Sequence, residues 1–418
     1  MTQAEWEKID SDLTTPEFFA GEAFHQTFKV MRREDPVHWT RGNYERGFWS
    51  LTRFDDIMAL LTDAVLFSQR QGTHMPPGAR EVDDEQFYAR GLDSAIPFMD
   101  PPKHKRVRQP FNKHFSVPAV QRLRGETEEI VDDLLREIGP RGQADLVEDV
   151  AAQLPVRLFL RMMGVPEQDW AWVRSRTLAV LHAQDKEVAG DRLPEDVIVE
   201  ASAEVQAYMD DLARVRRTNS TDDFTSIIAN MMVDGEYLSE RIVASMSRVI
   251  VAGGLETTRN AVAVGFRELI LRPQQARLLK IDPSIAKAAT EEVLRWVTPS
   301  KNRMRVAMAD TEIGGRKIDK GDWVVGWAVS GNRDESVFGE TADEFDITRW
   351  PNPHMAFGDG DHICLGRNIA RLEIQVLLQK FFSKIEDVRI VEEPDWIVSD
   401  NTAGFKKLQV EFTPTDAG

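Results

Sequence analysis

The chain has 418 residues, 42% of them hydrophobic, so it can form two lobes or one large layered domain and is too apolar for a disordered protein. Its net charge of −17 argues against nucleic acid and anionic membrane surfaces as partners, because both attract basic proteins. The single cysteine excludes an intramolecular disulfide and suits a reducing compartment. Residues 1–12 are polar and lack the apolar segment of a signal peptide, so we expect a cytoplasmic protein.

The first hundred residues predict short elements. A helix is expected over 24–33, two strands over 36–39 and 48–52, and a second helix over 53–62. Residues 72–99 then form a long irregular segment. Loops of this length in compact domains are often lids or binding loops, but an ordinary surface loop fits the pattern equally well.

A helical pattern dominates the middle of the chain. Helices are predicted over 103–115, 118–138, 150–163, 167–182, 195–217, 224–233, 239–271, 273–280 and 283–296. The most apolar of these carries Arg248, Glu256 and Arg259 in mid-span, which indicates a buried core helix and not a membrane span.

Strands return after Pro299. They are expected over 304–308, 312–313, 317–318 and 323–327, followed by a helix over 367–385 and strands over 396–399 and 408–412. The β-rich pieces near 36–70, 299–350 and 390–418 flank a helical core formed by 101–298 and 366–386. The sequence therefore predicts one interwoven domain over 1–418, mainly α with a minor β lobe.

Residues 357–366, Phe-Gly-Asp-Gly-Asp-His-Ile-Cys-Leu-Gly, hold the only cysteine, Cys364. Glycine lets a backbone turn sharply and approach a flat group closely. A metal-ligating thiolate needs N–H groups directed at it, because a bare buried anion is costly. A lone cysteine is more often a small buried hydrophobe, but this glycine-rich context favours a metal ligand.

Two adjacent glycines, Gly253 and Gly254, occupy the middle of the longest predicted helix, where each costs about 1 kcal/mol relative to alanine. Thr257 lies one turn after Gly253, so its hydroxyl can reach the Gly253 carbonyl and bend the helix. Glu256 adds an acid to an otherwise apolar stretch. The segment could therefore supply a functional site with a groove, a hydroxyl and a proton carrier. The alternative interpretation is that the glycines only allow another helix to pack closely here.

Two charged pairs share helix faces. Glu292 and Arg295, at i and i+3, would alone indicate an ordinary surface ion pair. His104 and Arg108, at i and i+4, could bind carboxylates of an anionic ligand, or could form a solvated cationic face.

The order and spacing of these motifs resemble those of the cytochrome P450 superfamily of haem-thiolate monooxygenases, over the chain from about Pro36. The family pattern Phe-Gly-x-Gly-x-His-x-Cys-x-Gly is matched at 357–366, the acid–alcohol motif at 253–257, and Glu-x-x-Arg at Glu292 and Arg295. The resemblance implies the cytochrome P450 fold and implies that Arg349 completes a structural network with that pair. A finer likeness is to soluble bacterial members that hydroxylate terpenoids and steroids.

The resemblance also implies haem b as cofactor. Cys364 is expected to ligate the iron, where thiolate donation favours O–O cleavage. Thr257 is expected to supply a hydrogen bond and Glu256 to relay protons during oxygen activation. The remaining residues expected to hold the cofactor are Gly253, Phe357, Gly366 and a propionate-binding set of His104, Arg108, Arg305 and His362.

The implied reaction inserts one oxygen atom from O₂ into a C–H bond of a small, mostly apolar molecule of the terpenoid, steroid or alkylaromatic class. Ser300, Lys301 and Asn302 are expected either to bind a polar substrate group or to point to solvent. The residues expected to contact substrate are Met75, Ile96, Phe98, Val249, Ala252 and Ser300.

No redox domain is apparent in the chain, so the resemblance implies electrons from a 2Fe–2S ferredoxin and its NAD(P)H-dependent reductase. Two alternatives remain: a peroxide-driven peroxygenase, which can do without Glu256 and Thr257, and a haem-binding sensor without catalysis. The expected docking patch for the ferredoxin comprises Lys103, Lys105, Arg106, Lys113, Arg367 and Arg371.

Overall fold

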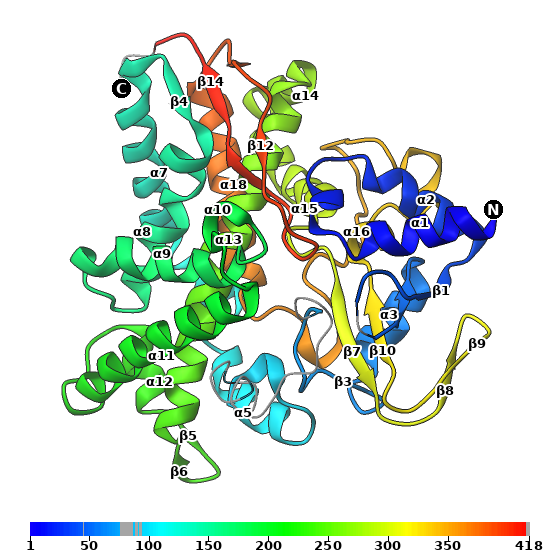
Figure 1. The fold of residues 1–418 in the computed structure, drawn as a ribbon. Helices are drawn as coiled ribbons and strands as arrows, with labels where there is room; N and C mark the ends of the chain where they lie inside the picture. The colour runs from blue at the N-terminus through cyan, green and yellow to red at the C-terminus, as the bar shows by residue number, and fades with distance from the viewer. Residues whose placement is uncertain (45, 76–86, 88–90, 92–93, 415–418) are drawn as a thin grey trace.

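The computed structural model describes residues 1–44, 46–75, 87, 91 and 94–414. Most of the expected irregular segment, residues 76–86, 88–90 and 92–93, lies outside the described residues. Figure 1 shows a helical part and a smaller lobe in which a sheet is covered by N-terminal helices. The described helices are α1 (Gln3–Leu13), α2 (Phe24–Glu34), α3 (Phe54–Thr62), α5 (Lys103–Asn112), α6 (Val117–Gln121), α7 (Arg124–Ile138), α8 (Gln153–Met162), α9 (Trp170–Leu181), α10 (Lys186–Ala189), α11 (Pro194–Thr218), α12 (Phe224–Ala229), α13 (Glu240–Ile270), α14 (Pro273–Ile281), α15 (Ala286–Val297), α16 (Ala328–Gly331), α17 (Glu335–Phe338) and α18 (Arg367–Lys384).

The largest sheet combines strands from distant parts of the chain, in the order β1-β2-β10-β7-β3. β2 and β10 are parallel, and the other neighbours in this sheet are antiparallel. The smaller sheets are β11-β14-β4, β12-β13, β5-β6 and β8-β9. The described strands are β1 (Val37–Thr40), β2 (Phe48–Leu51), β3 (Phe67–Ser68), β4 (Gln143–Asp145), β5 (Met232–Val233), β6 (Glu236–Tyr237), β7 (Arg303–Ala307), β8 (Thr311–Ile313), β9 (Arg316–Ile318), β10 (Trp323–Gly326), β11 (Arg389–Ile390), β12 (Asp395–Trp396), β13 (Phe405–Lys407) and β14 (Gln409–Glu411).

The two faces of β7 have different tasks. Met304 and Val306 pack with the aromatic residues of the N-terminal helices in one core cluster. Side chains alternate along a strand, so Arg303 and Arg305 face the opposite side, where both border a cavity. One face of β7 therefore packs in the core of the smaller lobe, and the other face places two arginine side chains at the cavity.

Helix α13 is the central helix of the larger part (Figure 1). Ser239 caps it, because its hydroxyl accepts a hydrogen bond from the Ile242 N–H at 3.3 Å. The helix contacts α8, α11, α15 and α18. Most of its length is buried despite Arg248, Glu256 and Arg259, as expected for a core helix. None of the described helices combines the length and apolarity of a membrane span.

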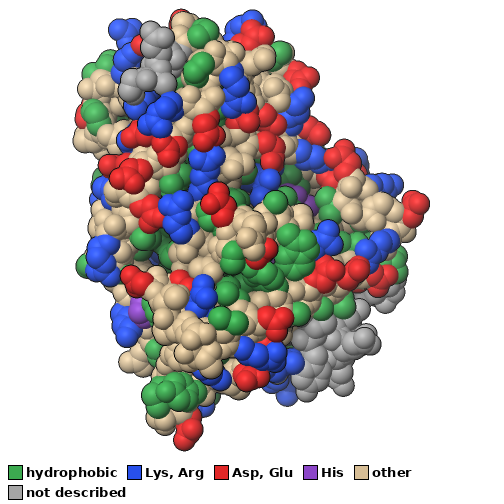
Figure 2. Space-filling view, turned by 90° about the vertical axis from the view of Figure 1, so that its left-hand side faces the viewer, with side chains coloured by type: hydrophobic (Ala, Val, Ile, Leu, Met, Phe, Trp, Pro, Cys, Tyr) green, Lys and Arg blue, Asp and Glu red, His purple; other side chains and the backbone are tan. Residues whose placement is uncertain are grey.

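Several boundaries differ from the sequence expectation. The helix expected over 224–233 ends at Ala229, and β5 and β6 form a hairpin whose turn places Asp234 and Gly235 at φ of 54° and 86°. A helix could not continue through that left-handed turn. α1 was not expected, although Thr2 and Glu5 form a capping box at its start. Figure 2 shows acidic and basic side chains interspersed over the face of α9 and α11, and exposed hydrophobic side chains at the hairpin.

Candidate functional site

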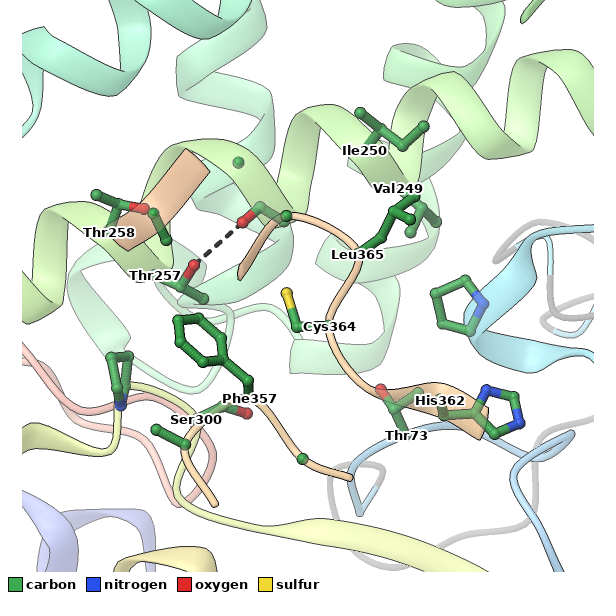
Figure 3. Close-up of a pocket in the computed structure, with 18 of the residues that line it drawn as sticks. Thr73, Val249, Ile250, Thr257, Thr258, Ser300, Phe357, His362, Cys364 and Leu365 are labelled. Atoms are coloured by element: carbon green, nitrogen blue, oxygen red, sulfur yellow. Dashed lines mark hydrogen bonds between the residues drawn. The ribbon is translucent and has the colours of Figure 1, made fainter. Parts of the chain in front are cut away.

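A cavity of about 320 Å³ lies between α13, the loop around Cys364, and β7. Most of its wall is apolar. Figure 3 shows Cys364 pointing into it, with Thr257, Val249 and Ile250 on the helix that passes over the loop. The structure thus brings together residues more than a hundred positions apart in the sequence.

The Cys364 loop is a tight turn before α18. Its backbone closes through the Cys364 N–H, which donates to the Phe357 carbonyl at 2.9 Å. Gly358 and Gly360 adopt φ of 68° and 65°, and a Cβ at Gly360 would lie 2.6 Å from the Leu61 carbonyl oxygen. Glycine is required at that position for two reasons, conformation and space.

The electrostatics around the sulfur suit a thiolate that binds a cation. Burial raises the pKa of the Cys364 thiol, and the Gly366 N–H and the cations of Arg303 and Arg108 oppose that rise. Arg367 donates to the Cys364 carbonyl at 2.9 Å and so holds the end of the loop. Backbone N–H groups and nearby cations favour the charged form of a cysteine.

The glycine pair on α13 serves two different contacts. A Cβ on Gly254 would lie 2.6 Å from the ring of Phe159, so this glycine permits α8 to approach closely. Gly253 has no atom within 4 Å of its hypothetical Cβ and borders the cavity. The Thr257 hydroxyl donates to the Gly253 carbonyl at 3.1 Å, as expected from the spacing (Figure 3). α13 remains helical throughout this segment.

Glu256 does not line the cavity. It is 2% exposed and lies behind the helix, with Oε1 2.6 Å from Arg259 Nη1 and 3.0 Å from His182 Nε2. Burial raises the pKa of Glu256, but Arg259 and His182 outweigh it and lower the pKa to about 2. The carboxyl is therefore ionised at neutral pH and faces away from Thr257's side of the helix.

The expected propionate-binding set converges at one end of the cavity. The rings of His104 and His362 lie 3.9 Å apart between centroids, close to Arg108 and Arg305. Both ring nitrogens of His104 and Nε2 of His362 are buried without a hydrogen-bond partner among the described residues. Burial lowers the pKa of His104 to about 4 and of His362 to about 2. Orphaned donors beside two arginines fit a ligand that carries carboxylates.

Glu292 and Arg295 form no surface pair. Both are fully buried, and two bonds of 2.8 Å join the guanidinium to the carboxylate. Arg349 Nε lies 3.3 Å from the same carboxylate, and Asn352 donates to it at 2.9 Å. Arg295 also donates to the carbonyls of Asn332, Ala342 and Glu344. The network ties α15 to the segment that leads into the Cys364 loop.

The expected substrate contacts divide into two groups. Ile96, Val249 and Ser300 line the cavity. Met75, Phe98 and Ala252 do not. Met75 packs in the sheet core, Phe98 packs against the helical core, and Ala252 lies beside the row of Val249, Gly253 and Thr257 that faces the cavity.

Lys301 neither binds substrate nor points to solvent. It is 2% exposed, and its ammonium donates to the carbonyls of Ser399 at 2.6 Å, Thr402 at 2.8 Å and Phe19 at 3.4 Å. Asn302 is also buried and donates to the Asp400 carbonyl at 3.0 Å. These two residues tie β7 to both ends of the chain.

Sequence reasoning did not single out several polar residues that line the cavity, although the 72–99 segment and residues 300–303 were expected near the substrate. Thr73, His74 and Arg303 form a polar corner with Ser300, and Glu373 lies on α18. Burial raises the pKa of Glu373 to about 8, against a hydrogen bond from Thr258. The signal for Glu373 was an acid between the apolar residues Leu372 and Ile374 on a predicted helix. Nothing in the sequence placed Thr73 and His74 beside Ser300.

Comparisons with known proteins identify the family. A model of the family described as cytochrome P450 matches residues 284–395. The putative cytochrome P450 126 of Mycobacterium tuberculosis is 33% identical over 408 residues, covering 96% of this chain and 97% of that protein. The chain belongs to the cytochrome P450 family.

Two further proteins agree with this cytochrome P450 assignment. Linalool 8-monooxygenase of Pseudomonas putida is 31% identical, with 96% of this chain and 99% of that protein covered. The crystal structure of CYP108D1 from Novosphingobium aromaticivorans superposes with a TM-score of 0.87 at 29% identity, covering 97% and 98% of the chains. The expected mainly α P450 fold with small sheets is confirmed, and the protein is a haem-thiolate monooxygenase whose cofactor is held by a cysteine thiolate.

Proposed function

We propose that this P450 oxidises a small, mostly apolar organic molecule at the cavity between Cys364 and α13, with electrons from a 2Fe–2S ferredoxin. The observation that carries the proposal is the shared cavity: the only cysteine lies on one wall, Thr257 on another, and apolar side chains form most of the rest. The haem would lie in the same cavity of about 320 Å³, so the apolar lining, and not the volume, supports a small apolar substrate.

In this proposal each part of the site holds one part of the cofactor. Haem, when bound, supplies activation of O₂ and oxygen insertion into a C–H bond. Cys364 is the iron ligand, with the Gly366 N–H tuning its basicity. The propionates are bound by His104, Arg108, Arg305 and His362. The side chain of Phe357 packs beside the haem, and the Arg371 guanidinium lies 4.6 Å from the centroid of the Phe357 ring.

Thr257 and Glu256 have different roles in proton transfer, because they lie on different sides of α13. Thr257 presents its hydroxyl to the cavity while donating to the Gly253 carbonyl, so it can orient a water or accept a proton there. Glu256 lies 3.0 Å from His182 and 2.6 Å from Arg259, behind the helix. It would relay protons toward the cavity only if its carboxylate left Arg259.

The network of Glu292, Arg295 and Arg349 has a structural role in this proposal. Its members donate to or accept from three segments that precede the Cys364 loop. Because the network is buried and its carboxylate is paired on several sides, it fixes the approach of that loop to α15.

The substrate class follows from the wall of the cavity. Ile96, Val249, Ile250 and Ala261 give apolar contacts near the residues that face Cys364. One relative is named as a linalool 8-monooxygenase, which supports a small organic substrate. The polar corner at Ser300 then faces one end of the bound molecule.

The proposal is tested by titrating the purified ferric holoenzyme with terpenoids, steroids, alkylaromatics and fatty acids. A ligand that displaces water from the iron changes its spin state and absorption. We expect strong changes with small apolar members, and a hydroxylated product when O₂, NAD(P)H, a ferredoxin and its reductase are added. Spectral binding without any product, with several ferredoxins, would instead favour a non-catalytic sensor.

A further inference from the structure

We infer that Arg303, Ser300, His74 and Thr73 form a carboxylate-binding corner for the substrate, separate from the propionate-binding set. The substrate would then be an apolar body that carries one carboxylate. This inference rests on the proposed function, because it names the substrate class of the same cavity.

The guanidinium of Arg303 donates to carbonyls and to one hydroxyl, and its Nη1 lies 3.5 Å from His74 Nε2. Nη1 donates to the carbonyls of Asn302 at 2.7 Å and Ser300 at 3.2 Å and to the Ser300 hydroxyl, and Nη2 lies 3.4 Å from the Ala356 carbonyl. Among the residues that the structure describes, no carboxylate lies within 4.0 Å of it. A guanidinium presents a planar fork that matches a carboxylate.

Arg303 is a cation in an enclosed, mainly apolar place. It borders the cavity, and burial lowers its pKa to about 10, which still leaves it charged at neutral pH. The Cys364 sulfur opposes this shift by charge attraction but makes no hydrogen bond to the guanidinium, so a carboxylate that does bond to it would be favoured in this enclosed place.

The haem does not account for all the positive charge. Its two propionates match two cations, Arg108 and Arg305. His104 and His362 add ring nitrogens beside these two arginines. Arg303 is a third arginine that lines the cavity, and among the described residues its guanidinium makes no hydrogen bond to a carboxylate, so it can bind an anionic group other than a propionate.

The corner is held in a fixed geometry. Ser300 is bridged to Thr402 in the C-terminal loop, and its hydroxyl lies 2.6 Å from His74 Nε2. The other ring nitrogen of His74 lies 2.9 Å from the Thr73 hydroxyl. Figure 3 shows Ser300 and Thr73 at the wall of the cavity opposite α13. A carboxylate at Arg303 would leave the rest of the molecule against Ile96 and Val249.

The test is a spectral titration of ferric holoenzyme with matched pairs: decanoic, perillic and phenylbutanoic acid, each against its methyl ester. We expect wild type to bind at least one acid about tenfold more tightly than its ester, since a hydrogen bond to a charged group contributes that much. Arg303→Gln should abolish this preference, Arg303→Lys should keep part of it, and Ser300→Ala should reduce it severalfold without changing the charge.

Other results of the titration would overturn the inference. Equal binding of acids and esters by wild type, or an acid preference that survives Arg303→Gln, overturns the inference and leaves the proposed function intact. Absence of spectral change with every acid and every ester contradicts both. If Arg303 serves a propionate instead, Arg303→Gln should lose haem to apomyoglobin as fast as Arg305→Gln, which also overturns the inference. We expect fast loss in Arg305→Gln alone.

Discussion

At the scale of single residues, the site depends on a few side chains that face the cavity and on others that hold them from behind. Cys364 and Thr257 face it, and Glu256 and Arg259 lie behind α13. The sequence motifs predicted Cys364, Thr257 and Glu256, but not Arg259 as the partner of Glu256 and not the direction of each side chain. Glu256 and Thr257 are adjacent, so they necessarily point about 100° apart around the helix.

Thr257→Ala removes the hydroxyl that faces the cavity. We expect the variant to keep its haem and its substrate-induced spectral change, because Thr257 contributes one hydrogen bond to the fold. Its turnover should be diverted to hydrogen peroxide, since proton delivery is no longer controlled. The measurement is the ratio of peroxide released to NAD(P)H consumed.

Thr257→Ser is the matched control for that experiment, because it keeps the hydroxyl and loses only the methyl group. Its ratio should stay close to that of wild type. Normal coupling in Thr257→Ala would show that the hydroxyl has no part in proton delivery.

At the scale of elements, hydrophobic period predicted the long helices well, including α13 and α18. Short elements were less predictable, because turns and pairing partners decide them: the β5–β6 hairpin depends on Asp234 and Gly235, and β3 exists through its pairing with β7. The motif around Cys364 was recognisable in the sequence, but the space that requires glycine at Gly360 is limited by the Leu61 carbonyl, which is distant in the sequence. The polar corner was not, since Thr73, Ser300 and Arg303 meet only through tertiary structure.

Lys301 shows how such contacts stabilise the arrangement of elements. Lys301→Met should lower Tm by about 5 °C at pH 7, because three buried carbonyls lose a donor.

Burial lowers the pKa of Lys301 to about 7, with Asp400 opposing the shift. Between pH 7 and 10 the unfolded chain therefore holds a proton that the native state has released, and wild-type stability gains with rising pH.

The measurement is Tm of both proteins from pH 6 to pH 9. We expect the deficit of Lys301→Met to grow toward pH 9. Lys320→Met, a change at an exposed lysine on the β9–β10 turn, should leave Tm close to that of wild type at every pH. A constant deficit across the range would contradict the buried-lysine account.

At the scale of the whole molecule, an acidic surface carries local cations around α5 and the start of α18. The structure reduces the expected docking patch, because Arg371 is held by Glu291 at 2.7 and 2.8 Å and Arg106 lies 3.3 Å from Asp234. Lys105 and Lys113 are exposed on the same part of the chain as the propionate-binding His104 and Arg108. They remain the best candidates to attract an acidic ferredoxin.

Charge reversal at both positions, Lys105→Glu with Lys113→Glu, should slow reduction of the protein by a 2Fe–2S ferredoxin about tenfold at low salt and flatten the salt dependence. The measurement is the stopped-flow rate of reduction across ionic strengths. The matched control reverses Lys317 and Lys320 on the remote β8–β9 hairpin region and should keep the wild-type rate. An unchanged rate in the first variant would exclude this patch as the docking site.

The central claim is that Cys364 ligates the haem iron in this cavity. It is tested most directly by the absorption spectrum of the reduced carbon monoxide complex. We expect the red-shifted band of thiolate ligation in wild type and its loss in Cys364→Ser, with the variant's circular dichroism showing a retained helical fold. A red-shifted band that persists in Cys364→Ser, or its absence from the folded, haem-loaded wild-type protein, would contradict the account.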